Sequence, residues 1–176
     1  MITPVPTDRA TVPTAPAGLP AGFTLRDAVE ADLPAIVAIY NSIIPGRMVT
    51  ADLEPVTVES RRPWFLAHQV PHWPLWVVSE TSGGDPGNVA AWLSFDTFYP
   101  RAAYDGSAMI AIYVAEAYRR RGLGRALLAT AIERAPGLSL HTLLGYIFGH
   151  NTPSLQLFES FGFQRWGHLP RVAILD

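Results

Sequence analysis

Two residue types are absent from this sequence of 176 residues, and each absence excludes a class of chemistry. Without cysteine the chain cannot form a disulfide scaffold, a cysteine-ligated zinc or iron–sulfur site, or a cysteine nucleophile. Lysine is missing as well, since all 13 cationic side chains are arginines, and this excludes Schiff-base catalysis by the protein. Covalent catalysis through a thiol or an amine of the protein is therefore ruled out.

Charge and long apolar runs are also scarce. Charged residues make up 16% of the chain, the net charge is −2 and the pI is near 6.2, which argues against broad binding of nucleic acid, because such binding needs a basic face. No uninterrupted apolar run approaches the ~18 residues that a membrane span requires. The N-terminus has no basic stretch followed by an apolar run, so we expect no secretion signal and a cytoplasmic location.

The remaining composition suits one domain with a substantial core. The mass is 19.2 kDa and 49% of the residues are hydrophobic, which is too apolar for a disordered chain. Prolines interrupt residues 1–22 among threonine and alanine, so this segment is expected to be an extended arm, either loose or strapped onto a partner subunit. Residues 23–176 are expected to form a single α/β domain.

Hydrophobic periodicity predicts alternating strands and helices in that domain. A helix is expected to follow Asp32, which can cap it, with Pro34 in its first turn. A second helix is expected around 61–68, with Pro63 near its start. Two further helices are expected at 122–135 and from Thr152 to Gly162. The predicted strands are 23–26, 75–80 and 89–95 (a β-hairpin around the loop 82–87), 108–114, 140–147 and 163–169.

The most informative stretch is the turn Arg119-Arg120-Arg121-Gly122-Leu123-Gly124, which links a buried strand to an amphipathic helix. Two glycines let the backbone approach an anion without a Cβ in the way. The first N–H groups of the helix lack intrahelical partners, and the helix dipole adds partial positive charge there. The arginines add charge-assisted contacts, so the turn predicts a pyrophosphate site.

Two other phosphate-binding motifs and a plain helix cap share features with this turn. A Rossmann fingerprint would need glycine in place of Leu127 and a turn joined directly to the strand, but residues 115–121 intervene. A Walker A loop needs a lysine. The plainer alternative is a solvated basic turn that only caps a core helix.

The rest of the chain places the turn in a wider pattern, in which the sequence resembles the GNAT superfamily of acetyl-CoA-dependent N-acyltransferases over roughly residues 24–172. Downstream, Asn151-x-x-Ser154-x-x-Leu157-x-x-x-Phe161-Gly162-Phe163 resembles the last helix and strand of that superfamily. Further motifs resemble its phosphinothricin and methionine-sulfoximine acetyltransferase branch: Ile39-Tyr40-Asn41, Glu54-Pro55-Val56-Thr57, Arg61, Trp64-Phe65, His68, Phe98-Tyr99-Pro100-Arg101-Ala102-Ala103-Tyr104 and His141-Thr142.

The resemblance implies a GNAT fold, with helices on both faces of a central mixed, twisted sheet that splays between strands 108–114 and 140–147. It also implies that the pantetheine arm of acetyl-CoA lies in the splay and pairs like an added strand. The residues implied to hold acetyl-CoA are Ile112, Tyr113, Val114, Arg119, Arg120, Arg121, Gly122, Leu123, Gly124, Arg125, Asn151 and Ser154. Those implied to contact the acceptor are Arg101, Tyr104 and Met109, with Arg101 able to hold a carboxylate.

The pattern breaks at the positions of proton transfer, so the catalytic residues stay unassigned. The branch carries a glutamate base where this chain has Met109, and many relatives carry a tyrosine acid where it has Phe158. Neither side chain can transfer a proton. A third departure is Thr50-Ala51-Asp52, where relatives have an aromatic after the threonine. Conceivable substitutes are Tyr113, Tyr118, Tyr146 and His150, each more simply explained as structural or exposed.

The resemblance thus implies an N-acetyltransferase acting on the amino group of a small molecule, of the amino-acid-analogue type, by direct attack of the amine on the thioester. Two alternatives stay open, namely a CoA-binding regulatory or vestigial domain with little turnover, and a protein or peptide N-acetyltransferase. A homodimer is possible. No metal is expected, because prolines keep one helix from presenting both His68 and His72 and no third ligand follows at suitable spacing. Without a base, the rate should follow the fraction of acceptor present as free amine.

Overall fold

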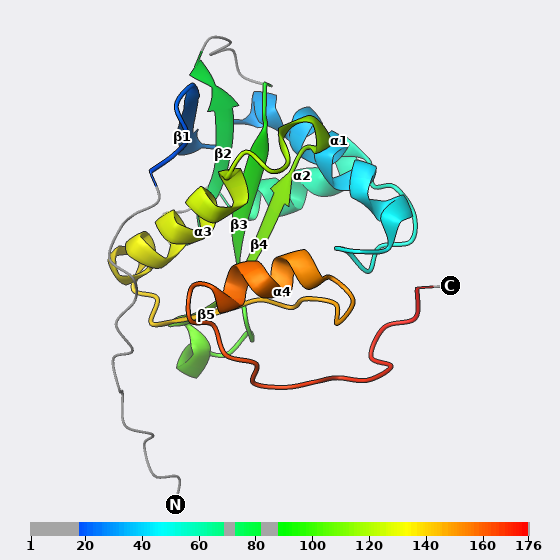
Figure 1. The fold of residues 1–176 in the computed structure, drawn as a ribbon, viewed down its shortest axis with the longest axis vertical. Coiled ribbons are helices and arrows are strands. Elements are labelled where there is room, and N and C mark those ends of the chain that lie inside the picture. Colours follow the sequence, from blue (N-terminus) through cyan, green and yellow to red (C-terminus); the bar gives the residue numbers. More distant parts are fainter. Residues whose placement is uncertain (1–17, 69–72, 82–87, 176) are drawn as a thin grey trace, which may run out of the picture.

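The computed structural model describes residues 18–68, 73–81 and 88–175. Strands and helices alternate along the chain, as the sequence predicts (Figure 1). The strands are β1 (Phe23–Asp27), β2 (Leu75–Glu80), β3 (Ala91–Thr97), β4 (Ser107–Val114) and β5 (Thr142–Leu144). The helices are α1 (Leu33–Ile43), α2 (Val58–Ala67), α3 (Leu123–Arg134) and α4 (Thr152–Glu159). Among the described residues, no helix is long and apolar enough to cross a membrane.

The five strands form one mixed sheet in the order β1-β2-β3-β4-β5. The first three pairings are antiparallel. β4 and β5 run parallel, but they pair only from Ser107 opposite Thr142 to Met109 opposite Leu144. Beyond Met109 the two strands part, and among the described residues no strand pairs with β4 on the β5 side from Ile110 to Val114. The predicted mixed sheet with a splay between these strands is confirmed.

Helices cover both faces of the sheet, as predicted (Figure 1). Residues alternate between the faces, since successive strand side chains point to opposite sides. On one face, Leu93, Ile110 and Leu127 belong to a buried cluster that joins the sheet to α3 and α4. On the other face, Val77 and Trp92 pack with residues of α1 and α2, such as Ile36. Two apolar cores therefore lie back to back across the sheet.

Three predicted elements differ from the structure. The strand expected at 140–147 is ordered only over Thr142–Leu144, and the described residues 163–169 form no strand. The second helix begins at Val58 rather than at 61, because Thr57 caps it: its hydroxyl accepts the Ser60 N–H at 3.1 Å. Pro63 therefore lies inside the helix. The loop predicted at 82–87 lies outside the described residues.

Asp32 does not cap α1 through its side chain, contrary to the prediction. Its carboxylate is buried and turns back toward β1 instead. It accepts hydrogen bonds from Arg26 at 2.6 and 2.8 Å and from the Val29 N–H at 2.8 Å. This ion pair fastens the start of α1 to the edge strand.

Residues 18–22, the described part of the predicted arm, lie next to the domain. The Phe23 N–H donates to the Pro20 carbonyl, and the Thr81 N–H donates to the Gly22 carbonyl. Leu19 packs against the core cluster on the α3 face. Where the arm ends and the domain begins stays a prediction.

Candidate active site

A pocket of about 240 Å³ lies on the α1/α2 face of the sheet, at its β3–β4 pair. The side chains that line it come from α1, the segment before α2, α2 itself, and both strands. They are Ile36, Val37, Tyr40, Val56, Arg61, Trp64, Trp92, Ser94, Asp96, Ala111 and Tyr113. The strand contribution follows from the register: Trp92 pairs with Tyr113, Ser94 with Ala111 and Asp96 with Met109.

Four aromatic rings line the pocket: Tyr40, Trp64, Trp92 and Tyr113. Trp92 stacks on Tyr113 with ring centroids 4.2 Å apart. Tyr40 meets Tyr113 edge-on at 5.4 Å, and Trp64 meets Trp92 edge-on at 5.7 Å. Burial raises the pKa of Tyr113, with further contributions from nearby charges, so that this phenol stays neutral well above physiological pH. The wall can therefore hold an apolar chain.

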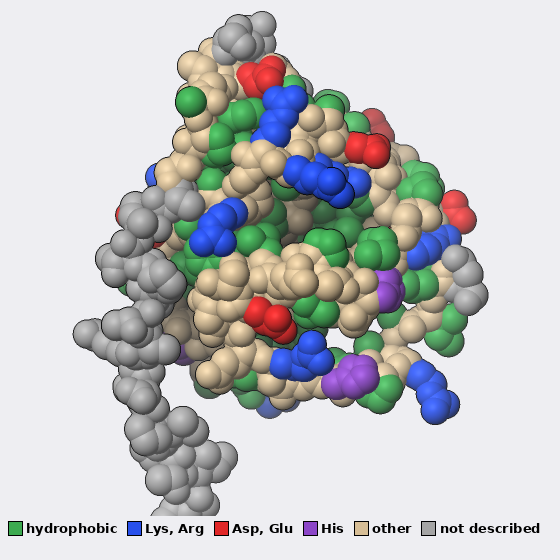
Figure 2. All heavy atoms as spheres, in the orientation of Figure 1, with side chains coloured by type: hydrophobic (Ala, Val, Ile, Leu, Met, Phe, Trp, Pro, Cys, Tyr) green, Lys and Arg blue, Asp and Glu red, His purple; other side chains and the backbone are tan. Residues whose placement is uncertain are grey.

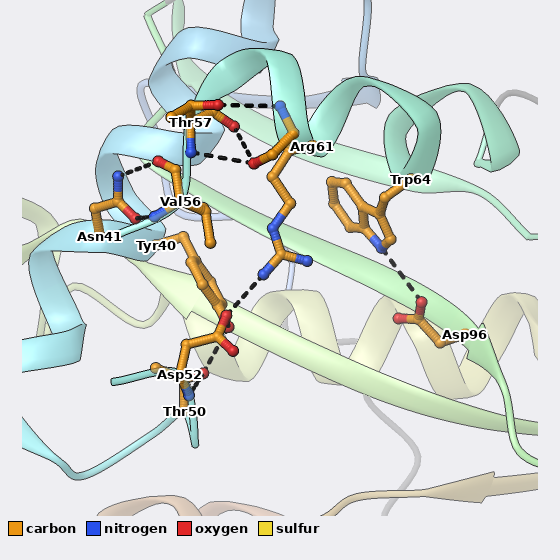
Figure 3. Close-up of polar contacts among 10 residues, drawn as sticks. Tyr40, Asn41, Thr50, Asp52, Val56, Thr57, Arg61, Trp64 and Asp96 are labelled. Atoms are coloured by element: carbon orange, nitrogen blue, oxygen red, sulfur yellow. Dashed lines mark hydrogen bonds and ion pairs between the residues drawn. The ribbon is translucent and has the colours of Figure 1, made fainter. Parts of the chain in front are cut away.

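One side of the pocket carries a cation, Arg61, which projects from α2 between Tyr40 and Trp64 (Figure 3). Its guanidinium lies 4.8 Å from the centre of the Tyr40 ring, and one terminal nitrogen donates to Asp52 at 2.9 Å. The Tyr40 hydroxyl donates to Asp52 as well, at 2.6 Å. Burial, followed by the bond to Asp52, raises the pKa of Tyr40. These contacts fix the guanidinium at the pocket's edge.

Another part of the wall carries a carboxylate, Asp96, near the end of β3 (Figure 3). It accepts hydrogen bonds from the Trp64 indole at 3.3 Å and the Ser94 hydroxyl at 2.9 Å. His68 lies behind it, with Nε2 3.2 Å from the carboxylate. The other ring nitrogen of His68 is 2.7 Å from the Trp64 carbonyl. A carbonyl only accepts, so Nδ1 carries a proton that it donates there.

Asp96 and His68 therefore titrate as a pair. Burial opposes ionisation of Asp96, but His68 and the bonds from Ser94 and Trp64 outweigh it and lower the pKa of the carboxyl. Burial likewise disfavours the His68 cation, but Asp96 and the Trp64 carbonyl outweigh it and raise the pKa of the ring. His68 Nε2 is buried and its nearest polar partner is the Asp96 carboxylate, 3.2 Å away.

On the other face of the sheet lies the turn before α3, for which the sequence predicts an anion site. Arg120 and Gly122 both have positive φ, at 60° and 82°, and Gly122 immediately precedes the first helical residue. Arginine side chains gather around a hollow on this face (Figure 2). Arg121 lies over the Tyr118 ring, and Arg125 lies over the Phe161 ring. Arg119 and Arg120 are exposed.

The stretch of β4 that pairs with β3 but not with β5 leads from this turn toward the pocket. Ile112, Tyr113 and Val114 belong to it, with Ile112 and Val114 facing the α3 side and Tyr113 facing the pocket. Asn151 is buried at the start of α4, where its oxygen accepts the Ser154 N–H at 3.2 Å and its nitrogen donates to the Met48 carbonyl at 2.9 Å. The Asn151 side chain thus ties α4 to the segment after α1.

The remaining predicted residues lie elsewhere. Arg101 and Tyr104 surround the exposed Tyr99 and do not line the pocket, so their contact with an acceptor stays a prediction. Met109 is half-buried between Asp96 and Leu144. Phe158 is buried in the core, with its ring close against Gly145.

Sequence reasoning missed Asp96. Its signal was present, because Trp92, Ser94 and Asp96 alternate along one strand and so share a face. The position of Asp96 opposite Met109 follows only from the pairing of β3 with β4, and this pairing cannot be read from the sequence of one strand.

Comparison with known proteins gives one family. The model of the Acetyltransferase (GNAT) family matches residues 36–163. YwnH of Bacillus subtilis, provisionally named a phosphinothricin acetyltransferase, is 52% identical over 88% of this chain and 91% of its own length. The L-methionine sulfoximine/L-methionine sulfone acetyltransferase of Pseudomonas paraeruginosa is 33% identical over 85% of this chain and 84% of its own.

A solved structure agrees with these sequence matches. It is a GNAT superfamily phosphinothricin acetyltransferase from Sinorhizobium meliloti in complex with acetyl-CoA, with a TM-score of 0.75 and 27% identity over 83% of this chain and 77% of that one. The residues matched by the family model include strands β2 to β5, the turn before α3 and every residue that lines the pocket. The chain therefore belongs to the acetyltransferase (GNAT) family.

Proposed function

We propose that this protein transfers the acetyl group of acetyl-CoA to the amino group of a small molecule of the amino-acid-analogue type. The observation that carries the proposal is the position of the pocket. It lies on β3 and β4, beside the stretch of β4 that pairs with β3 but, among the described residues, with no strand on the β5 side, and it bears a cation and a carboxylate among aromatic rings. Such a pocket suits a compact zwitterion with an apolar part.

The residues around the open edge fit acetyl-CoA. On the side of β4 that faces β5, the peptide groups from Ile112 to Val114 have no neighbouring strand among the described residues. They can therefore pair with the amides of an extended pantetheine arm. The α3 N-terminus, with Gly122 in the left-handed conformation and exposed arginines beside it, offers N–H groups and charge to a pyrophosphate. Acetyl-CoA supplies a thioester whose carbonyl carbon an amine can attack, with the CoA thiolate as leaving group.

Several cofactor contacts belong to this proposal. Leu123 and Gly124 would present backbone N–H groups, and Arg119, Arg120, Arg121 and Arg125 would add charge. Asn151 and Ser154 would lie beside the cofactor at the start of α4, as first expected. The Asn151 side chain also holds this end of α4 in place through its bonds to Ser154 and Met48, and its amide keeps a second N–H donor and a second lone pair for a ligand.

The acceptor side follows from the charges in the pocket. Arg61 can pair with a carboxylate, and Asp96 can hold an ammonium group, while Trp92 and Tyr113 contact the apolar part. Phosphinothricin and methionine sulfoximine, which appear in the names of the relatives, are amino-acid analogues of this kind. A protein N-terminus would need an open groove, and nothing in the described residues favours one over this pocket.

The test is CoA thiol release from acetyl-CoA with a panel of amino acids, sulfoximines, simple amines and peptides. We expect the largest kcat/KM with a free α-amino acid or its analogue, and much smaller values with its decarboxylated amine or with a peptide. No turnover of any acceptor by a folded protein that binds acetyl-CoA would contradict the proposal.

Within that panel we predict that phosphinothricin is a poor acceptor. The chain has Met109 and Ala51 where the resembling branch has a glutamate and an aromatic wall. Competition between phosphinothricin and methionine sulfoximine in one assay measures this directly. Phosphinothricin turnover equal to that of the best acceptor would mean that these two positions do not set specificity.

A further inference from the structure

We propose that Asp96 is the catalytic residue that takes the proton from the acceptor's ammonium group, in place of the glutamate that Met109 replaces. The inference rests on the proposed function, and it assigns a role that the sequence left open. Its basis is the sheet register. Asp96 on β3 stands directly opposite Met109 on β4, and both side chains lie on the pocket face.

Directly opposed residues of antiparallel strands have Cβ atoms about 4.5–5.5 Å apart. A carboxylate at Asp96 can therefore reach the space that a glutamate at Met109 would reach from the neighbouring strand. The half-buried Met109 leaves the carboxylate access from that side. The carboxylate that would act as the base thus stands on β3 in this chain, instead of on the neighbouring strand β4.

The surroundings of Asp96 keep it charged and oriented. Ser94 and the Trp64 indole donate to it from the strand and from α2, while its side chain stays one-third exposed toward the pocket. A carboxylate held in this way accepts a hydrogen bond from an incoming ammonium group and lies within one proton transfer of it.

His68 extends the path as a positioning residue. With its Nδ1–H held by the Trp64 carbonyl, the ring presents Nε2 to Asp96, so the neutral ring can accept a proton there. Other titratable and charged groups of this pocket are Arg61 on α2, Tyr40 on α1 and Tyr113 on β4, and Asp52 is bonded to Arg61 and Tyr40 at its edge. Both tyrosines have raised pKa values and stay neutral, and the pKa of His68, which contacts Asp96, is raised above its ordinary value of 6.5.

The step balances as follows. The ammonium nitrogen gives one proton to an Asp96 oxygen, from which it passes to neutral His68 Nε2. The freed lone pair forms the C–N bond to the thioester carbonyl carbon, and the C–S bond breaks. The second nitrogen proton ends on the CoA sulfur, and His68 later returns its proton to solvent. The path works only while His68 is neutral, so the rate should rise with pH through the His68 pKa.

The main test compares Asp96→Asn with Asp27→Asn, which removes an exposed carboxylate on β1. We expect Asp96→Asn to lower kcat/KM at pH 7 by about 10²–10³-fold, the usual range for losing a general base, and to remove the neutral limb of the pH profile. Asp27→Asn should match the wild type. Acetyl-CoA affinity, measured by calorimetry, should be unchanged in both, which separates failure of this inference from failure of the proposed function.

Moving the carboxylate back gives the decisive variant. In the double variant Asp96→Asn/Met109→Glu, a carboxylate returns to the pocket from β4, and we expect at least a tenfold recovery over Asp96→Asn. A twofold or smaller loss in Asp96→Asn, with the pH profile unchanged, would overturn the assignment. So would a double variant no faster than Asp96→Asn.

A test on the wild type covers the case in which Asp96→Asn does not fold. The ring nitrogens of His68 are titrated by nitrogen-15 NMR, and the pKa is compared with that of kcat/KM. We expect the two to coincide, with His68 protonated at Nδ1 in the neutral ring. A rate profile that follows only the acceptor's own amine pKa would overturn the inference.

Discussion

At the scale of single residues, the Asp96–His68 pair links stability to pH. The raised pKa of His68 gives stability that is fully present below its ordinary value of 6.5 and is lost as pH rises through the raised value. The lowered pKa of Asp96 gives stability that is present above 3.8 and is lost as pH falls through the lowered value. The pair therefore stabilises the fold most in the mildly acidic window between them.

We predict that Asp96→Asn costs about 1–2 kcal/mol of unfolding free energy at about pH 5.5, and clearly less at about pH 9. The reason is that the wild-type pair has already lost its proton at the higher pH. Denaturant unfolding of both proteins at the two pH values measures the difference. An equal cost at both would show that the pair does not hold its proton in the folded state.

Arg61 gives a second prediction at this scale. Replacing it by glutamine should raise KM about 10–100-fold for an acceptor with a carboxylate, because a charge-assisted pair is lost. An uncharged amine of the same shape should be affected far less. Arg62→Gln, on the same helix with its side chain outside the pocket, is the matched control. Equal effects on both acceptors would mean that Arg61 serves only to brace Asp52 and Tyr40.

At the scale of elements, the start of α3 can be tested without disturbing the fold. A Cβ on Gly124 would lie 3.7 and 3.8 Å from Leu157 and Val114, which is ordinary contact. We predict that Gly124→Val stays folded but loses at least tenfold in acetyl-CoA affinity, because its methyl groups block the approach to the backbone. Calorimetric titration measures the affinity.

The control for that variant is Gly137→Val, in the 3-10 turn Ala135–Leu138 that follows α3, where an added Cβ meets nothing within 4 Å. It should bind acetyl-CoA as the wild type does. If Gly124→Val binds equally well while folded, the pyrophosphate does not lie on this turn.

The elements themselves were largely predictable from the sequence. Strong periodicity and clear stop signals predicted α1, α3, α4 and the strands up to β4 within a few residues. The wrong predictions concern residues whose conformation depends on contacts with distant parts of the chain. Residues 140–147 are apolar enough for a strand, but only Thr142–Leu144 find a partner on β4. Asp32 had the right position for a cap, yet Arg26 on the adjacent strand binds it more strongly.

The site was predictable only in part for the same reason. Local spacing predicted the arginine–glycine turn, because an anion site at a helix start is built from consecutive residues. The pocket joins residues from four separated segments of the chain, and the role proposed for its carboxylate depends on the residue opposite it on the neighbouring strand. Arg101 was favoured as the acceptor's cation on resemblance, whereas the cation that lines the pocket is Arg61.

At the scale of the whole molecule, the two faces of the sheet divide the work. The α3/α4 face carries the larger core and the basic turn, and the α1/α2 face carries the aromatic pocket. β4, whose pairing with β5 ends at Met109, lies between them (Figure 1). Under the proposed function, the thioester and the amine would reach β4 from opposite faces of the sheet.

β4 and β5 pair over three residues only, so hydrogen bonds join these strands at one end and leave a seam between them at the other. A pantetheine arm lying in that seam would be a structural part of the sheet, so its binding energy would count toward the resistance of the chain to unfolding. At a ligand concentration a hundred times Kd this amounts to about 2.7 kcal/mol. We predict a melting temperature that climbs steadily with acetyl-CoA, and slower amide exchange at Ile112 and Val114. The lifetime of the enzyme would then depend on the acetyl-CoA supply that it consumes.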